Sequence, residues 1–500
     1  MKKILTIIFD GFGMKESDYG NAIINANMVN FNKFYNENPH TTLFASGHYV
    51  GLHDGQFGNS EIGHQTIGAG RLIKSREVLT DEYLDNLYLN EDENIQKLKG
   101  LTSKTIHLMG LASDGNVHAG IDDFIKMYEY LIKIGFTKIF FHLITDGRDT
   151  DSKAAYNYIS LIEKNIQKNK VGCIASICGR YYAMDRDKNY DRTKVYYDLV
   201  TKGRGIEILN IENALKSSYD KGITDEFLRP MMINREGTIK DGDVLIWMNY
   251  RSDRSKQILL ALTNPKFTEF DVTLMPNLEV FTFFNHDKLI KANVLINEPD
   301  INNSLGIYLS KLGMTQARIA ESEKYPHVTY FFDEGYEGKL DGVDKFYIPS
   351  PDVATYDLKP EMSAVSVTKK VINAIEDDYD FILVNFANPD MVGHTGNMEA
   401  TTKACMALDI CFSKILQVAE DNFYTVILLA DHGNADTMLY EDGTPCTTHS
   451  YEKVPFVIND SKVKLKEGGD LTNVAPTILD YMDISIPTEM TSYSLIESEE

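Results

Sequence analysis

Cysteine is scarce in this chain of 500 residues. The five cysteines are odd in number and scattered along the sequence: Cys173, Cys178, Cys405, Cys411 and Cys446. That distribution argues against a disulfide framework and is typical of a protein kept in a reducing compartment.

Long hydrophobic runs are also missing. No stretch approaches the ~20 apolar residues that a membrane-spanning helix needs. The N-terminal run, residues 4–9, stops at Asp10. It is too short for a secretory signal peptide and indicates a buried strand instead. We therefore expect a cytoplasmic protein without a membrane partner.

Positive charge is the third shortage, because 50 lysines and arginines face 73 aspartates and glutamates, which gives a net charge of −23. So acidic a chain disfavours nucleic acids and anionic membrane surfaces as partners. A small anionic substrate would need its own local cluster of positive side chains. The length and the 43% hydrophobic content fit a globular protein of two or three domains.

Apolar runs that fit buried strands alternate with helix-length segments, a pattern that predicts a parallel α/β fold. The predicted strands are residues 4–9, 41–45, 105–110, 138–144, 171–178, 244–248, 380–386, 424–430 and 454–458. The predicted helices are residues 122–133, 154–167, 399–419 and 474–482. Pro455 predicts that the run 454–458 is an edge strand, since proline cannot donate to a sheet ladder.

Two changes of pattern suggest domain boundaries. The first lies near residues 71–78, and the second is the segment 286–303, where Asn, Asp and Pro indicate a return linker. The strand and helix alternation resumes after it. We therefore predict two α/β domains, separated by one boundary near residues 71–78 and another at the segment 286–303.

A serine lies in the stretch FGNSEIGH, residues 57–64, between glycine-rich flanks. Ser60 follows Gly-Asn and precedes a glutamate, which is typical of the start of a helix, where free backbone N–H groups can bind an anion. Serine is a weak nucleophile until a neighbour removes its proton, and the local sequence offers no such neighbour. Without partners from elsewhere in the fold, the stretch would be a simple helix cap in a loop.

Aspartates and histidines follow three of the predicted strands or lie in a later polar loop. The set is Asp10, Asp390, His394, Asp431, His432 and His449. Open α/β sheets bind ligands beyond the carboxyl ends of their strands. With Ser60, the set is large enough for two divalent ions, and oxygen and nitrogen ligands without thiolate favour Mn²⁺ or Zn²⁺ over Mg²⁺. A metal ion beside Ser60 would also activate its hydroxyl. Taken singly, each residue would fit a turn, a cap or an ordinary loop histidine.

Arginine-containing loops follow strands of the central segment in the same way. Their arginines are Arg148, Arg180, Arg186, Arg251 and Arg254. In an acidic protein, arginines at strand ends suit bidentate binding of carboxylate or phosphate. His118 and Asp149 lie in the same group of loops and could move protons to and from a hydroxyl. Any one of these arginines alone would be explained by a surface ion pair.

The chain closely resembles the cofactor-independent phosphoglycerate mutases, a family of two-metal phosphoryl-transfer enzymes in the alkaline phosphatase superfamily. The resemblance runs over essentially the whole chain. It rests on the stretches FGNSEIGH, SDGNVH, DGRD, GRYYAMDRD, YRSDR, EKYPHVT, PSPDVATYD, NPDMVGHTG and DHGNAD. It implies an alkaline-phosphatase-like metal domain, residues 1–75 and 300–500, with an inserted α/β phosphotransferase domain, residues 76–299.

The resemblance also implies a role for each candidate residue. Ser60 is similar to the serine that is transiently phosphorylated, and Asp149 to the general base. One metal ion would be held by Asp390, His394 and His449, and the other by Asp10, Ser60, Asp431 and His432. The substrate would be bound by His118, Arg148, Asp149, Arg180, Arg186, Arg251, Arg254 and Lys324. The implied cofactors are two Mn²⁺ ions, with Mg²⁺, Co²⁺ or Zn²⁺ as alternatives, and no bisphosphoglycerate.

The implied reaction interconverts 3-phosphoglycerate and 2-phosphoglycerate in glycolysis and gluconeogenesis, through a phosphoserine intermediate, in a monomer that acts on a small-molecule substrate. Two alternatives stay open on the residues alone. One is a phosphatase or phosphopentomutase of the same superfamily, and the other is a non-enzymatic metal-binding protein. One loop departs from the family pattern: a glycine pair usually follows the Tyr-Phe-Phe run, where this chain has Asp333-Glu334-Gly335-Tyr336. The departure concerns the local loop shape near Lys324, not the role of the lysine.

Overall fold

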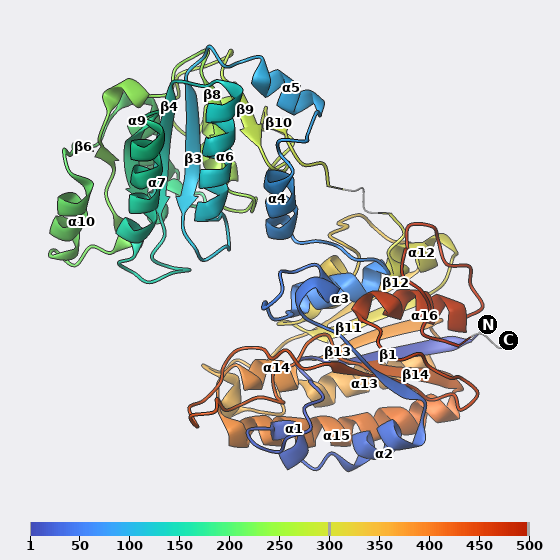
Figure 1. Ribbon diagram of the computed structural model, residues 1–500. Helices are drawn as coiled ribbons and strands as arrows, with labels where there is room; N and C mark the ends of the chain where they lie inside the picture. Colours follow the sequence, from blue (N-terminus) through green and yellow to red (C-terminus); the bar gives the residue numbers. More distant parts are fainter. Residues whose placement is uncertain (1, 299–301, 498–500) are drawn as a thin grey trace. The chain divides into compact units, whose positions relative to one another are not determined.

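The chain folds into two compact units in a computed structural model that describes residues 2–298 and 302–497 (Figure 1). Unit 1 comprises Met1–Ser75 and Asp300–Glu500, and unit 2 comprises Arg76–Pro299. Each unit has its own β-sheet with helices on it. The α/β class predicted from the sequence is therefore confirmed.

The sheet of unit 1 has the strand order β12-β11-β13-β1-β14-β15-β2 in the described residues. Strands from β12 to β14 pair in parallel, and β15 pairs antiparallel with both β14 and β2. The strands are β1 (Lys3–Phe9), β2 (His40–Leu43), β11 (Gln316–Glu321), β12 (Val343–Ile348), β13 (Phe381–Phe386), β14 (Tyr424–Leu429) and β15 (Val454–Ile458).

The prediction that residues 454–458 form an edge strand is wrong. β15 lies inside the sheet, between β14 and β2, and the short β2 is at the edge instead. The proline is tolerated there because the pairing of β15 with β14 covers only residues 456–458. Pro455 lies beyond that ladder, so its missing N–H interrupts none of its bonds.

Helices cover both faces of this sheet (Figure 1). On one face α13 packs against β11 and β13, and α15 packs against β14. On the other face α3 packs against α12 and α16. The helices of unit 1 are α1 (Ala22–Asn25), α2 (Val29–Glu37), α3 (Ser60–Ala69), α12 (Leu305–Lys311), α13 (Ala364–Glu376), α14 (Asn388–Gly393), α15 (Met398–Asp421) and α16 (Val474–Tyr481).

The sheet of unit 2 has the order β10-β9-β8-β3-β4-β5-β7-β6 in the described residues. The strands from β10 to β5 are parallel, and β7 runs antiparallel to β5. The strands are β3 (Ile106–Ala112), β4 (Ile139–Thr145), β5 (Cys173–Gly179), β6 (Ile206–Glu207), β7 (Met231–Met232), β8 (Val244–Trp247), β9 (Glu279–Thr282) and β10 (Asn293–Val294).

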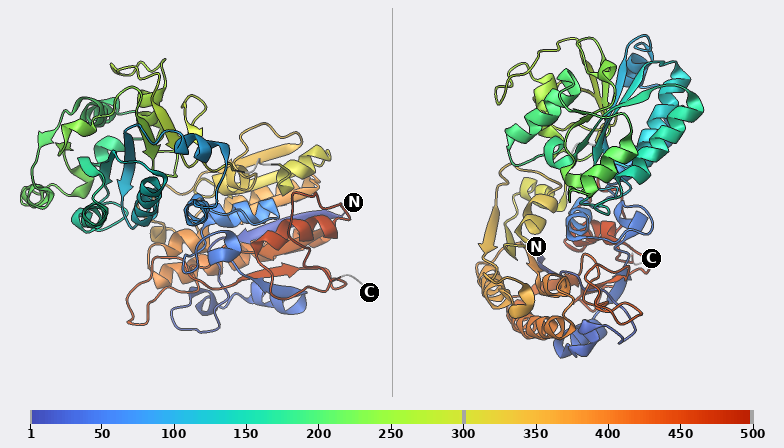
Figure 2. Two further views of the ribbon diagram at one scale, coloured as in Figure 1. Left: turned by 45° about the horizontal axis from the view of Figure 1, so that its top comes forward. Right: turned by 90° about the vertical axis from the view of Figure 1, so that its left-hand side faces the viewer.

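Strands β3 and β8, in the middle of the unit 2 sheet, are buried on both faces, as expected for a parallel sheet. Alternate residues serve two separate cores: Leu108 and Ile246 belong to one, and Met109 and Trp247 to the other. Helices α6 and α7 complete the first core, and α9 and α11 complete the second. Figure 2, on the right, shows the strands between these two groups of helices.

The helices of unit 2 include two that the sequence pattern predicted, α6 and α7, and others that it did not. They are α4 (Arg76–Asp85), α5 (Glu93–Lys99), α6 (Ile121–Ile134), α7 (Ala155–Asn169), α8 (Arg180–Ala183), α9 (Tyr190–Lys202), α10 (Ile211–Tyr219) and α11 (Lys256–Thr263). None of the helices in the described part of the chain meets the length and hydropathy needed to traverse a lipid bilayer.

Candidate active site

Three carboxylates of unit 1 converge at one edge of its sheet. β1 lies between β13 and β14, and all three strands run parallel, so their carboxyl ends meet. Asp10 directly follows β1, Asp431 lies two residues past β14, and Asp390 is on α14, the short helix after β13. All three are buried. Their position is the one at which open α/β sheets bind ligands.

Ser60 reaches this cluster from the first turn of α3. Asn59 caps the helix by accepting a hydrogen bond from the Ile62 N–H at 3.0 Å. The helix approaches the end of β14 closely because residue 63 is glycine; a Cβ there would lie 2.8 Å from the Cβ of Asp431. Ser60 Oγ donates to Asp10 Oδ1 at 3.1 Å and lies 2.9 Å from His432 Nε2. The neighbours that the local sequence lacks thus come from distant segments.

Lys324 adds a positive charge at the centre of the cluster. Its Nζ donates to Asp10 Oδ1 at 2.7 Å, to Asp390 Oδ2 at 2.6 Å and to Ser60 Oγ at 2.6 Å. Burial lowers the pKa of this ammonium, but Asp10 and Asp390 outweigh that effect and the pKa is raised. Lys324 is therefore charged, and it holds the serine oxygen and two carboxylates around one point.

The carboxylates nevertheless outnumber this one ammonium. Burial, together with the charge of Asp431, raises the pKa of Asp10 to about 7. Burial also acts to raise the pKa of Asp431, but His432, His64 and Lys324 lower it more strongly. The pKa of Asp390 is likewise held well below its ordinary value, because Lys324 offsets the effect of burial. A surplus of negative charge in a buried site favours the binding of cations.

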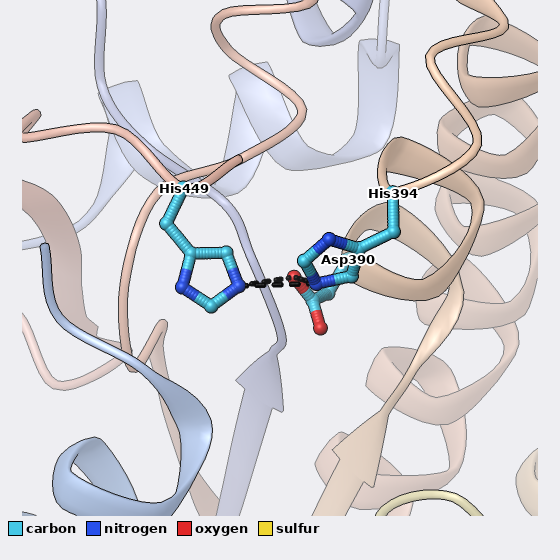
Figure 3. Close-up of side chains that lie close together, drawn as sticks. All are labelled: Asp390, His394 and His449. Atoms are coloured by element: carbon cyan, nitrogen blue, oxygen red, sulfur yellow. Dashed lines mark hydrogen bonds and ion pairs between the residues drawn. The ribbon is translucent and has the colours of Figure 1, made fainter. Parts of the chain in front are cut away.

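Asp390, His394 and His449 form one candidate metal site (Figure 3). His394 Nε2 and His449 Nε2 each lie 3.3 Å from Asp390 Oδ1 and 3.1 Å from each other. Backbone carbonyls hold the opposite ring nitrogens: Thr447 O is 2.9 Å from His394 Nδ1, and Gly58 O is 2.7 Å from His449 Nδ1. Donation of both Nδ1–H groups to carbonyls leaves the two Nε2 lone pairs facing the carboxylate, which suits a shared divalent ion.

A second group of ligand atoms surrounds Asp10. His432 Nε2 lies 3.5 Å from both Asp10 Oδ1 and Asp431 Oδ2. Asp10 also belongs to two sets of closely spaced ligand atoms, one with Asp390 and His432 and the other with His64 and Asp431. Among the described residues, the buried Asp431 Oδ2 has no hydrogen-bond partner. An unsatisfied carboxylate oxygen beside a histidine nitrogen fits a divalent cation.

The sequence prediction missed His64 and Asn385, which both belong to this centre. Both side chains are fully buried, and His64 Nδ1 lies 3.2 Å from Asp431 Oδ2. Asn385, on β13, donates to Asp10 Oδ2 at 2.6 Å. The spacing of His64, four residues after Ser60 on a predicted helix, was a usable signal. Asn385 had no such signal, since it stands within an apolar strand.

The loop that departs from the family pattern is built around two buried acids. Glu334 has a φ of 55°, in the left-handed region that favours glycine. It forms an ion pair with Arg71, which follows α3. Asp333 lies 3.6 Å from the guanidinium of Arg318, which is also buried. Charge pairing therefore accompanies a turn that a glycine pair would form with less strain.

Unit 2 gathers its own charged residues at the carboxyl end of its sheet, in the loops after β3, β4, β5 and β8. Arg180, at the end of β5, donates from one nitrogen to Asp146 Oδ1 at 2.6 Å and to Asp149 Oδ2 at 2.5 Å. Asp146 is itself held by Ser113 Oγ at 2.7 Å and by the backbone N–H groups of residues 148 and 149. This network fixes Arg180 and Asp149 relative to each other.

The other arginines surround this network less tightly. Arg186 pairs with Asp253 at 2.9 Å, and Arg254 donates to Met184 O at 2.9 Å. Burial lowers the pKa of Arg254, as do the charges of Arg180, Arg186 and Arg148. The guanidinium groups therefore lie close enough to repel one another, which prepares the cluster for an anion.

His118 is neutral in this cluster. Burial and the charge of Arg180 lower its pKa to about 4, and Arg251 acts in the same direction. Its buried Nδ1 has no hydrogen-bond partner among the described residues. A neutral imidazole beside arginines can donate to or accept from a substrate oxygen.

The predicted residues thus form two clusters, one in each unit. The cluster of unit 1 contains Asp10, Ser60, Lys324, Asp390, His394, Asp431, His432 and His449. The cluster of unit 2 contains His118, Arg148, Asp149, Arg180, Arg186, Arg251 and Arg254.

This combination of a parallel α/β sheet, a buried serine and clustered Asp and His ligands defines a class of metal-dependent enzymes. A family model described as the metalloenzyme superfamily matches residues 2–486. The chain belongs to that superfamily.

Individual relatives narrow the family further. A protein of Bacteroides thetaiotaomicron named 2,3-bisphosphoglycerate-independent phosphoglycerate mutase is 43% identical over 503 residues, covering 99% of this chain and 100% of the relative. A protein of the same name from Prochlorococcus marinus is 41% identical over 509 residues, covering 99% of this chain and 94% of the relative. The chain is therefore a member of the 2,3-bisphosphoglycerate-independent phosphoglycerate mutase family of isomerases.

A solved structure agrees with this assignment. The phosphoglycerate mutase of Leishmania mexicana, determined at low cobalt concentration, matches with a TM-score of 0.71 and 27% sequence identity. The match covers 100% of this chain and 98% of that one.

Proposed function

We propose that the protein interconverts 3-phosphoglycerate and 2-phosphoglycerate without 2,3-bisphosphoglycerate, through a phosphoserine at Ser60. The observation that carries the proposal is the position of Ser60 Oγ, which lies within 3.1 Å of Asp10, His432 and Lys324. The helix start at α3 also directs free backbone N–H groups to this point. A serine hydroxyl held in this way by a histidine and an ammonium suits the role of an activated nucleophile.

The proposed cofactors are two divalent ions, with Mn²⁺ as the expected metal. Asp390, His394 and His449 would hold one ion. Asp10, Ser60, Asp431 and His432 would hold the other. Ions bound there would promote deprotonation of the Ser60 hydroxyl and neutralise charge on the phosphoryl oxygens. Cobalt is a further candidate because the Leishmania mexicana relative was determined with it.

The chain's own residues carry out a transfer in two steps. Ser60 Oγ, deprotonated before it reacts, attacks the phosphorus of 3-phosphoglycerate, the bond from phosphorus to the C3 oxygen breaks, and that oxygen takes a proton from a protonated Asp149 carboxyl. Asp149 then removes the proton of the C2 hydroxyl, whose oxygen attacks the phosphoserine, and the bond to Ser60 breaks. Lys324 stabilises the charge that develops on the phosphoryl group in both steps.

The arginine cluster of unit 2 would retain the glycerate between the two steps. Arg180 is the centre of this cluster because its guanidinium is fixed by Asp146 and Asp149. His118, Arg148, Arg186, Arg251 and Arg254 would bind the carboxylate and phosphate of the substrate. Without such retention the phosphoryl group of Ser60 would pass to water, and the protein would act as a phosphatase.

The test is turnover of metal-depleted protein after Mn²⁺ is restored. 3-Phosphoglycerate is added without bisphosphoglycerate, and 2-phosphoglycerate and free phosphate are followed together, with Ser60→Ala as the control variant. We expect 2-phosphoglycerate to form only when both Mn²⁺ and Ser60 are present. Release of free phosphate instead would favour the phosphatase alternative, and turnover by Ser60→Ala would exclude the phosphoserine. Phosphopentomutase activity is tested with a pentose phosphate in the same assay.

We also infer that the protein acts as a monomer on a small molecule, in the cytoplasm and in glycolysis or gluconeogenesis. These inferences follow from the family and from the acidic, cysteine-poor composition.

A further inference from the structure

A chain of buried polar contacts links two carboxylates that face each other from different strands. Asn385 Nδ2 donates to Asp10 Oδ2 at 2.6 Å and lies 3.0 Å from His64 Nε2. His64 Nδ1 lies 2.9 Å from the carbonyl oxygen of Ser60 and 3.2 Å from Asp431 Oδ2. The side chains of His64, Asn385, Asp10 and Asp431 are all fully buried. None of the steps proposed above uses His64 or Asn385.

The contacts determine which nitrogen of His64 carries the proton. The short contact with the Asp10 carboxylate requires the amide nitrogen of Asn385, not its oxygen, to face that way. The second N–H of the same amide group then points at His64 Nε2, which must accept it. The hydrogen is therefore on Nδ1, which donates to the Ser60 carbonyl and lies 3.2 Å from Asp431 Oδ2.

We propose that His64 and Asn385 are positioning residues that hold Asp10, Asp431 and the Ser60 backbone in the arrangement that binds a divalent ion. The inference rests on the proposed function, since it takes these three residues as one ligand set. Asn385 orients Asp10 from the neighbouring strand. His64 orients Asp431 and ties it to the first turn of α3, so that one imidazole connects two ligands and, through Asn385, a third.

His64 itself is not assigned as a metal ligand. Its Nε2 accepts from Asn385 and its Nδ1–H donates to the Ser60 carbonyl, which leaves no free lone pair for an ion. Groups that orient metal ligands in this way commonly change metal affinity by about 10-fold to 100-fold when they are replaced.

Two replacements of His64 test the contacts of its Nδ1 and its Nε2 separately. The amide nitrogen of asparagine stands near the place of Nδ1, so His64→Asn keeps a donor to the Ser60 carbonyl beside Asp431. Glutamine reaches the place of Nε2, so His64→Gln keeps the contact with Asn385 and loses that donor. The matched control is His107→Asn, because His107 is an equally buried histidine of unit 2.

The experiment titrates Mn²⁺ alone into metal-depleted full-length protein and counts bound ions by calorimetry or by the electron paramagnetic resonance of free Mn²⁺. We expect His64→Gln to lower the affinity for one of the two ions by about 100-fold, and His64→Asn to lower it by about 10-fold or less. His107→Asn should change the affinity for neither ion. The second ion keeps its wild-type affinity in all three. Asn385→Leu should weaken the same ion as His64→Gln does.

Three outcomes would overturn the inference in variants that still unfold cooperatively. The first is that His64→Gln binds both ions with wild-type affinity, and the second is that it binds both ions with equally lowered affinity. The third is that His64→Asn loses an ion that His64→Gln still binds. The last pattern would make His64 a direct ligand through Nε2. The wild-type titration tests the proposed function separately, because binding of fewer than two ions by wild-type protein contradicts that function whatever the variants do.

Discussion

Both units place charged residues at the carboxyl ends of their parallel strands, but the two groups of residues differ in how deeply they are buried. In unit 1 the side chains of Asp10, Asp431 and His432 are fully buried and contact one another or a shared neighbour. In unit 2 the side chains of Arg148 and Arg186 are each 51% exposed. Arg180 is the exception, with a side chain that is 2% exposed.

The difference fits the proposed division into a reacting centre in unit 1 and a recognition surface in unit 2. Buried charges are costly unless they are paired and hydrogen-bonded, so those of unit 1 are held rigidly by one another. Half-exposed arginines keep their side-chain freedom and can adapt to an anion that they bind. We therefore expect changes in unit 1 to abolish chemistry and metal binding, and changes in unit 2 to affect substrate affinity and retention.

The largest expected effect is that of Ser60→Ala. Removal of the proposed nucleophile should lower turnover of 3-phosphoglycerate by about 10⁴-fold or more, because in the described part of the chain no other hydroxyl shares its contacts with Lys324 and Asp10. The measurement is formation of 2-phosphoglycerate at saturating Mn²⁺. Substantial residual turnover would mean that the reacting centre is not in unit 1.

Removal of metal should distinguish the stability of the two units. Ligands that bind only the folded state stabilise it, by about 2.7 kcal/mol at a concentration 100 times the dissociation constant. We expect chelation to abolish activity. It should also lower the protection of amide hydrogens against exchange in unit 1 alone, as measured by hydrogen exchange in each unit. An equal loss of protection in unit 2 would contradict the assignment of the ions to unit 1.

Arginine-to-lysine replacements in unit 2 test whether burial decides the contribution of each arginine. Arg180→Lys should lower kcat/KM by about 10²-fold to 10³-fold, since one guanidinium nitrogen holds Asp146 and Asp149 and the remaining nitrogens stay available for a substrate, whereas lysine has a single nitrogen. Arg186→Lys, at an exposed position, should lower it by about 10-fold. Both variants should bind Mn²⁺ as the wild type does. Loss of metal in either variant would contradict the assignment of metal binding to unit 1 and substrate binding to unit 2.

The smallest effect concerns the pH dependence of stability, to which a buried acid in each unit contributes. Burial raises the pKa of Glu321 in unit 1 to about 7, and burial with the charge of Asp81 raises that of Asp123 in unit 2 to about 8. The folded state then binds more protons than the unfolded state. The contribution of the Glu321 carboxyl to the free energy of unfolding is therefore fully present below pH 4.5, and it is lost as the pH rises through 7.

Glu321→Gln removes the ionisable carboxyl, and with it the loss of stability at higher pH that Glu321 causes in unit 1. Between pH 5 and pH 8 the wild type should lose about 2 kcal/mol of unfolding free energy relative to this variant. Urea denaturation at the two pH values measures the difference, with the exposed neighbour Glu323→Gln as the control. A difference that is the same at both pH values would contradict the raised pKa.

Much of the fold and of the candidate site could be predicted from local sequence. The apolar alternation predicted the α/β class because strand and helix periodicity is a property of short segments. Asp and His residues after predicted strands indicated a metal centre, since the carboxyl ends of parallel strands meet at one edge. The spacing of Asp390 and His394 suggested a shared ion, and the two do lie on one turn, at α14.

Other features depended on which strands are neighbours, and local sequence does not contain that information. The contacts of Ser60 join it to residues 10, 324 and 432, far apart along the chain. The inner position of β15 depends on where its pairing with β14 stops, which a proline rule cannot supply.

By itself, then, the sequence determined the fold class, the family and most of the residues that the two clusters contain, because these are recorded in periodicity and in local motifs. Only the tertiary structure decided that His64 and Asn385 join two carboxylates, and that Glu334 pairs with Arg71 in place of a glycine turn. The physical reason is that a buried polar group must find its partner wherever the packed chain brings one within hydrogen-bond distance.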